Sequence, residues 1–373
     1  MKKDQFIRIC LVFAGVLVFL ITSSKFSLSK DSEDTIAIGL LISDIRLQEA
    51  RRGAELAVQK ANQDKQLNGK IVKLITRSME GPWGTGAKQT VDLVFNQKVW
   101  AIIGSHDGRN AHLAEQVIAK TQVSYISAWA GDPSLYQAYV PWYFSMVPND
   151  IQQARALVQE IYQHKKYNTV AVLSDQEYDA ETAINYFKEE ASRIKAEKPI
   201  EISYSNTGGD IQELLKKIEN SKCEAVILFG KSRPSLELIK AFQKEKLNLA
   251  VYGTLAVLGE NPLQSFDLPD FENTTIIDAV YWESESGKAF IDKYKEGFGT
   301  MPGAQAAYAY DAIQLIIETI KKSGFDREIF REALKEINFQ GITGSVQFDE
   351  FGNRIQPASL VKIYNGLPRA LKK

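Results

Sequence analysis

Ser105, His106 and Asp107 carry the three side-chain types of a hydrolase triad, and they are consecutive in the sequence. A working triad depends on side chains that converge on one proton path, whereas the side chains of consecutive residues diverge. We therefore interpret this stretch as a polar loop that contacts a ligand, and not as a catalytic site. The backbone amides that open the following helix would favour an anionic group at the same place.

Aromatic and basic residues supply the other candidate contacts. Trp129 directly follows an apolar run, so its ring can form an aromatic wall for a ligand, or it can pack between two domains. Trp83 lies in the glycine-rich stretch 81–86, which lacks the Lys-Ser/Thr pair of a phosphate loop. Trp83 therefore either caps a binding cleft or packs within its own loop. Lys231 and Arg233 can meet a ligand carboxylate, or they are solvated charges at the rim.

The sequence gives no support for a metal site, a cofactor or a cysteine nucleophile. Cys223 is the one cysteine after the amino-terminal segment, so no internal disulfide can form there. It stands at the start of an apolar run, where a buried and inert thiol is expected. The 45 basic and 46 acidic residues are nearly balanced, which argues against nucleic acid as a partner.

Two short apolar runs, 99–104 and 123–127, flank an amphipathic helix that we predict over 111–120. This order predicts a right-handed crossover that places the two strands parallel. In open parallel sheets, ligands bind just beyond the carboxyl ends of the strands. The loops 105–110 and 128–133 therefore point to the same edge, where they form one wall of a small-molecule cleft.

Alternation of strands and helices appears before about residue 150 and starts again after it. One continuous sheet of that size would be unusually wide, so the pattern predicts an α/β protein with two doubly wound, Rossmann-like units. Near the carboxyl end, residues 341–363 are predicted to form a hairpin with its turn at 349–353.

Residues 1–24 have the three-part layout of a secretory signal peptide: a basic start, thirteen apolar residues over 9–21, and small residues after them. A membrane span usually needs about 20 apolar residues, and an uncleaved amino-terminal anchor is the alternative. Residues 25–34 are predicted to be a solvated tether. The protein is therefore expected outside the cytoplasm, in the periplasm.

Several stretches, in order along the chain, resemble periplasmic binding proteins of the branched-chain amino-acid (Leu/Ile/Val-binding) type. The run 337–354 resembles the GxTGxVxFDxxGdR ending of that family. The stretches 51–57, 174–178 and 307–312 also fit, and the match covers essentially all of 35–366.

The resemblance implies a type I periplasmic-binding fold, in which two lobes are joined by three crossovers and a ligand closes the hinge between them. The crossovers would lie near 147–150, 278–282 and 344–347. Lobe 1 would hold residues 35–148 plus 281–345, and lobe 2 would hold residues 149–280 plus 346–373.

The family's ligand contacts fall on these same loops. The serine that meets the ligand carboxylate matches Gly108, and the small residue followed by a threonine matches Ala130 and Gly131. The cleft tyrosine matches Tyr178, whereas the acidic residue that meets the ligand ammonium falls near Leu255. The clamp for an α-amino acid is therefore largely missing, and we expect a different small polar or aromatic-bearing ligand.

These observations together predict an exported solute-binding receptor of an ABC-type importer. It would act as a monomer, with a small-molecule ligand and the membrane subunits of the transporter as partners. The ligand would stabilise the closed state through contacts that the open state lacks. A ligand sensor of the same fold, held by an uncleaved anchor, is the alternative. An amidase-like enzyme is a third class, which no triad, metal cluster or phosphate loop supports.

Overall fold

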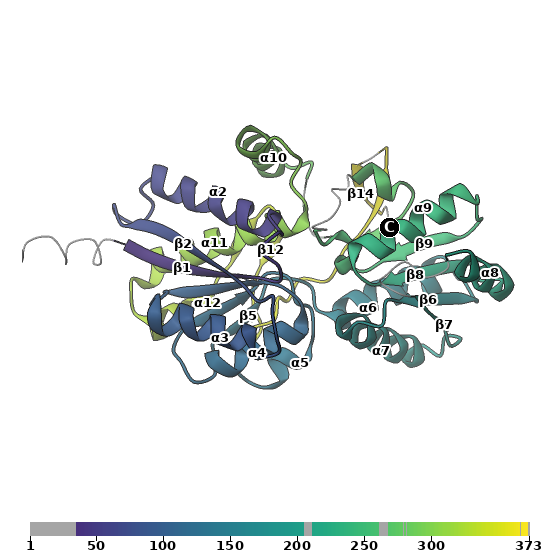
Figure 1. Cartoon of the computed structure of the whole chain (residues 1–373), viewed down its shortest axis with the longest axis horizontal. Helices are drawn as coiled ribbons and strands as arrows, with labels where there is room; N and C mark the ends of the chain where they lie inside the picture. Colours follow the sequence, from purple (N-terminus) through teal and green to yellow (C-terminus); the bar gives the residue numbers. More distant parts are fainter. Residues whose placement is uncertain are drawn as a thin grey trace, which may run out of the picture.

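The structure is a computed structural model that describes residues 35–204, 211–260, 268–278, 280, 282–365 and 367–371. The predicted signal peptide (1–24) and tether (25–34) lie outside the described residues. Within the described part, no helix has the length and the apolar character needed to cross a membrane. The chain forms two α/β halves, which we name lobe 1 and lobe 2 (Figure 1).

Lobe 1 contains a parallel sheet of five strands, which are β1 (Thr35–Ile42), β2 (Ile71–Ser78), β3 (Ala101–Ser105), β4 (Ser124–Ser127) and β5 (Tyr143–Ser145). Their order in the sheet is β2-β1-β3-β4-β5. Every residue of β3 and β4 is buried, as is usual for parallel strands with helices on both faces. The parallel pairing of β3 with β4 confirms the predicted crossover and aligns the ends of both strands.

Helices cover both faces of this sheet (Figure 1). They are α2 (Glu49–Gln63), α3 (Thr85–Val91), the π-helix η1 (Asp92–Asn96), α4 (Gly108–Ile118), α5 (Ser134–Gln137), α10 (Glu285–Phe298), α11 (Ala304–Ser323) and α12 (Arg327–Lys335). The closest approach is between α2 and α11, where a Cβ atom on Gly53 would lie 2.0 Å from the carbonyl oxygen of Ala306. Glycine is therefore required at this crossing.

Lobe 2 contains a sheet of seven strands in the order β14-β13-β10-β9-β8-β6-β7. The strands are β6 (Val170–Ser174), β7 (Ile200–Ser203), β8 (Ala225–Phe229), β9 (Ala250–Gly253), β10 (Thr275–Ile277), β13 (Leu360–Tyr364) and β14 (Leu367–Ala370). Its helices are α6 (Asp150–Val158), the π-helix η2 (Gln159–His164), α7 (Tyr178–Arg193), α8 (Ile211–Ser221), α9 (Ser232–Lys244) and the short 3-10 turns η3 (Leu255–Leu258) and η4 (Leu268–Phe271).

The chain passes between the lobes three times. It leaves lobe 1 after β5 and enters the sheet of lobe 2 at β6. It returns after β10 to form α11, which packs on α2, and it leaves lobe 1 again after the short hairpin of β11 (Phe339–Gly341) and β12 (Gly344–Val346). This is the expected arrangement of two doubly wound lobes joined by three crossovers.

The predicted single hairpin over 341–363 is wrong, although its turn is present. Gly352 has φ +84°, and its amide donates to the carbonyl oxygen of Asp349 at 3.0 Å. However, β12 pairs with β11, whereas β13 pairs with β10 and β14. Alternate side chains of β13 are buried, so one face of this strand is apolar and needs cover. The strand gains that cover by pairing within the sheet of lobe 2 and not by pairing with β12.

Candidate functional site

The candidate site is a cavity of about 450 Å³ that lies between the lobes, where strands of both sheets end. Lobe 1 contributes the loops after β3 and β4, with Asp107, Trp129 and Gly131. Lobe 2 contributes the start of α7 and the loop after β8, with Tyr178 and Lys231. Small-molecule pockets typically enclose about 300–1,000 Å³, so this volume suits a small metabolite.

Trp129 stands between the two lobes and also lines the cavity. Its ring meets Tyr308 of α11 edge-on, with ring centroids 6.3 Å apart. On its other side, a Cβ atom placed on Gly259 of lobe 2 would lie 3.4 Å from Trp129 Cζ2. Trp129 therefore has both of the roles that we considered as alternatives: it packs between the lobes and it forms an aromatic wall of the cavity.

Tyr178 reaches across the cleft to lobe 1. Its hydroxyl donates to Asp132 Oδ2 at 2.7 Å, and the same carboxylate lies 3.0 Å from His112 Nε2. The hydrogen bond with Asp132 raises the pKa of His112 to about 9, so this imidazole is protonated at neutral pH. Burial acts to raise the pKa of Asp132, but its bonds with His112, Ser134 and Tyr178 outweigh burial and hold that pKa at about 2.

Two helices of lobe 1 begin at the cleft, and carboxylates of lobe 2 cap both of them. Asp179 accepts from the amide of Gly108, the first residue of α4, at 3.0 and 3.2 Å. Glu260 accepts from the amides of Gln48 and Glu49 at the start of α2, at 2.7 Å each. Helix starts are ready-made anion sites. The protein's own side chains therefore fill both of these sites in this closed arrangement.

Three of the sequence-predicted contacts point into lobe 1. His106 is buried, and its Nε2 lies 2.7 Å from the hydroxyl of Tyr125. Ser105 is the last residue of the fully buried strand β3. Ala130 packs in the apolar cluster that also holds Tyr125 and Leu135. The strand and its packing therefore continue further into the loops than the sequence suggested, so the cavity wall begins at Asp107.

The other predicted contacts have separate positions. Trp83 is 75% exposed in the loop before α3, outside the set of residues that line the cavity. Arg233 pairs with Glu237 one turn along α9, at 3.2 Å. Lys231 lines the cavity at its rim, where its Nζ lies 3.6 Å from Glu177.

Sequence reasoning missed Asp150, Asp175, Asp179 and Glu260, which all line the cavity. Asp179 follows the tyrosine that the family pattern identifies, so its neighbour was the available signal. The helix α6 is capped by Asn149, whose side chain accepts from Gln152 N at 2.9 Å. This leaves the carboxyl group of Asp150 free to face the cavity.

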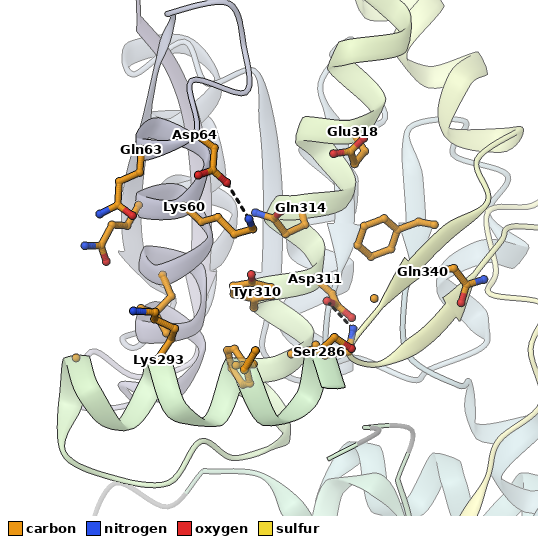
Figure 2. A pocket seen from close by; sticks show the side chains of 18 of the residues that line it. Lys60, Gln63, Asp64, Ser286, Lys293, Tyr310, Asp311, Gln314, Glu318 and Gln340 are labelled. Atoms are coloured by element: carbon orange, nitrogen blue, oxygen red, sulfur yellow. Dashed lines mark hydrogen bonds and ion pairs between the residues drawn. The ribbon is translucent and has the colours of Figure 1, made fainter. Parts of the chain in front are cut away.

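A larger hollow of about 1,090 Å³ lies in lobe 1, between α2, α10, α11 and β11 (Figure 2). Several of its charged groups are paired locally. Lys60 bonds to Asp64 at 2.8 Å, and Asp311 accepts from the amide of Ile342 at 3.1 Å. Because its walls belong to one lobe, a ligand there would not bridge the hinge. The inter-lobe cavity is therefore the candidate site.

The described residues contain no group of three or more His, Cys, Asp or Glu side chains that could hold a metal ion. Several acidic side chains at the cleft, such as Asp179, Glu260 and Asp132, are instead directed to backbone amides and to His112. What the arrangement offers chemically is hydrogen bonding, charge and one aromatic face.

Comparison with known proteins gives one consistent match. Residues 43–366 match the family model described as periplasmic binding protein. The chain is 23% identical over 309 residues to Leu/Ile/Val-binding protein homolog 1 of Brucella suis, covering 81% of this chain and 82% of that protein.

Solved structures agree with the fold. The substrate-binding protein LivJ of the branched-chain amino acid transporter of Streptococcus pneumoniae, in complex with isoleucine, matches with a TM-score of 0.78 at 22% identity, covering 90% of this chain and 98% of that one. A solute-binding protein of an ABC transporter from R. palustris, in complex with benzoate, has a TM-score of 0.77 at 19% identity, covering 90% and 95%. The family match over most of the sequence and the two-lobed fold lead to one conclusion: the chain belongs to the periplasmic binding proteins.

Proposed function

We propose that this protein is an exported solute receptor that captures a small molecule between its lobes and delivers it to the membrane subunits of an ABC-type importer. The observation that carries the proposal is the 450 Å³ cavity, whose walls come from the strand ends of both lobes. A molecule held there contacts both lobes only when they are closed. Its binding therefore stabilises the closed state relative to the open state.

The relatives support a transport role without fixing the ligand. One structural neighbour holds isoleucine and another holds benzoate. Micromolar capture needs about −8 kcal/mol, which a few buried hydrogen bonds and one aromatic face can supply. We propose that the receptor acts by binding alone, as a monomer, and that no bond of the ligand is made or broken.

Calorimetric titration against a metabolite library tests this proposal. Trp129→Ala removes the aromatic wall and should weaken binding of any ligand found by about tenfold or more, given the roughly 1.5–3 kcal/mol that burying a large apolar side chain contributes. Trp83→Ala is the matched control, because this side chain is 75% exposed and away from the cavity. If no small molecule binds or shifts the melting temperature, solute capture is refuted.

Export is a separate part of the proposal and rests on the sequence of residues 1–24. Mass spectrometry of the mature protein, recovered from a cell envelope fraction, reads its first residue directly. A start near Lys25 supports a cleaved signal peptide. A start at Met1 supports the anchored form and, with it, a sensor held at the membrane.

A further inference from the structure

The charges that line the inter-lobe cavity are unevenly distributed. Among the residues that the structure describes, two basic residues line it, Arg109 and Lys231. The acidic residues of the same part of the chain that line it are Asp107, Asp150, Asp175, Glu177, Asp179 and Glu260. The two bases also have nearby partners, since the guanidinium of Arg109 lies 5.8 Å from the ring centre of Tyr178 and Lys231 lies 3.6 Å from Glu177.

Hydrogen bonds within the protein account for four of these carboxylates. Asp179 and Glu260 cap the helices of lobe 1, as described above. Asp107 caps its own helix by accepting from the amide of Asn110 at 2.8 Å. Asp175 accepts from the amide of Lys231 at 2.8 Å. These groups shape the cleft, and each of them already accepts a hydrogen bond from a backbone amide.

Asp150 is different. It is 9% exposed and lines the cavity, and its carboxyl accepts one long bond of 3.3 Å from the side-chain amide of Gln153. Burial raises the pKa of Asp150, and the negative charges of Asp179 and Asp132 raise it further. As the first residue of α6, it lies where the helix dipole favours a carboxylate. The site therefore holds a buried acid that a cation would stabilise.

The position of Asp150 places this acid beside the aromatic wall. A Cβ atom on Gly131 would lie 2.9 Å from Asp150 Oδ1, so the carboxyl touches the loop that carries Trp129 two residues earlier. A cation held near an aromatic face gains about 0.5–2 kcal/mol from the ring. In lobe 1, the amides that open α4 and α2, which would otherwise attract an anion, are occupied by Asp179 and Glu260.

We propose that the ligand of this cleft is an organic cation, such as a protonated amine, whose charge pairs with Asp150 while its apolar body lies against Trp129. This inference rests on the proposed function as a solute receptor. It excludes free carboxylates and ordinary α-amino acids as the preferred ligands. The acidic lining repels carboxylates, and the family's clamp for α-amino acids is largely missing.

The test is a titration of the wild-type protein with two matched libraries, one of organic cations and one of neutral and anionic compounds of the same size. Benzylamine, benzyl alcohol and benzoate form one such set, since they share a ring and differ in charge. We expect the binders to be cations that bind at least about tenfold more tightly than their neutral counterparts, as one charge-assisted hydrogen bond implies. The order of the three affinities, measured with the wild-type protein alone, shows whether the cleft prefers a cation.

Asp150→Asn then tests the assignment, with Asp292→Asn on the exposed face of α10 as the control. We expect Asp150→Asn to remove the preference for the charged compound and the control to keep it. If cations bind and Asp150→Asn leaves their affinity unchanged, the role of Asp150 is refuted. If only neutral or anionic compounds bind, the ligand class is wrong while the receptor function stands. If nothing in either library binds, the proposed function itself fails.

Discussion

Asp179→Asn should make the protein more stable, and the gain should be larger at neutral to alkaline pH than at acidic pH. Burial raises the pKa of Asp179 from its ordinary value of 3.8 to about 7, with Asp107 adding to the effect and the amide of Gly108 opposing it. At about 1.36 kcal/mol for each pKa unit, a rise from 3.8 to about 7 disfavours the charged carboxylate by about 4 kcal/mol. Asparagine keeps an oxygen for the Gly108 amide and carries no charge.

The sign follows from proton linkage. A carboxyl whose pKa is raised on folding stabilises the folded state fully below the unfolded value of 3.8, and this contribution is lost as pH rises through about 7. Because Asp179 is half-buried and water screens part of the effect, we expect a gain of about 2 kcal/mol in the free energy of unfolding at pH 8.5. The gain should shrink to less than half at pH 5.

Urea unfolding of both proteins at pH 5 and pH 8.5, followed by circular dichroism, measures this difference. Groups such as His112 titrate in both proteins and cancel in the comparison. Asp292→Asn, at an exposed position, should show the same small effect at both pH values. The reasoning is refuted if Asp179→Asn is less stable than the wild type at pH 8.5, or if its gain is equal at both pH values.

Three further changes test other contacts. Gly53→Ala should lower the free energy of unfolding by about 1–3 kcal/mol, because its Cβ would lie 2.0 Å from a carbonyl oxygen of α11. Gly297→Ala, where the nearest atom would be 3.9 Å away, is the control, and equal melting temperatures of the two variants would contradict the argument. Tyr178→Phe removes the 2.7 Å bond to Asp132, so small-angle scattering should show a more open ensemble, and an unchanged radius of gyration counts against this contact. Asp311→Asn should lower the free energy of unfolding in urea by about 1–3 kcal/mol, since both carboxylate oxygens accept from backbone amides and asparagine keeps only one acceptor oxygen. It should also remove the loss of stability that accompanies a pH rise from about 4 through about 6, and a variant that retains this loss contradicts the role of the group.

The strands and the edge at which they end could be predicted, because buried parallel strands are short continuous apolar runs. Trp129 was identified for the same reason, since it stands directly after such a strand, whereas Tyr178 was matched through the family resemblance. Asp179 and Glu260 could not be found this way. Their partners are backbone amides of the other lobe, far away in sequence, and an amide leaves no residue type to recognise.

His106 shows the opposite error. Its polar side chain after a strand suggested a contact with the ligand, but the hydroxyl of Tyr125 on the neighbouring strand provides an internal partner at 2.7 Å. The sequence does not reveal whether a side chain at the end of a strand points into the cleft or into its own lobe. The misplaced hairpin has a similar cause, because the partner of β13 is set by the passage of the chain into the other lobe and not by the turn at Gly352.

The carboxylates of Asp179 and Glu260 belong to the same chain as the helix starts they cap. They therefore compete with dissolved anions for those amides. A group attached to the same chain acts at an effective concentration in the millimolar range. A dissolved acid at micromolar levels would have to displace such a group from each site, against a thousandfold excess. Anions at micromolar levels are thus disfavoured at the starts of α4 and α2, before any selection by the shape of the cleft begins.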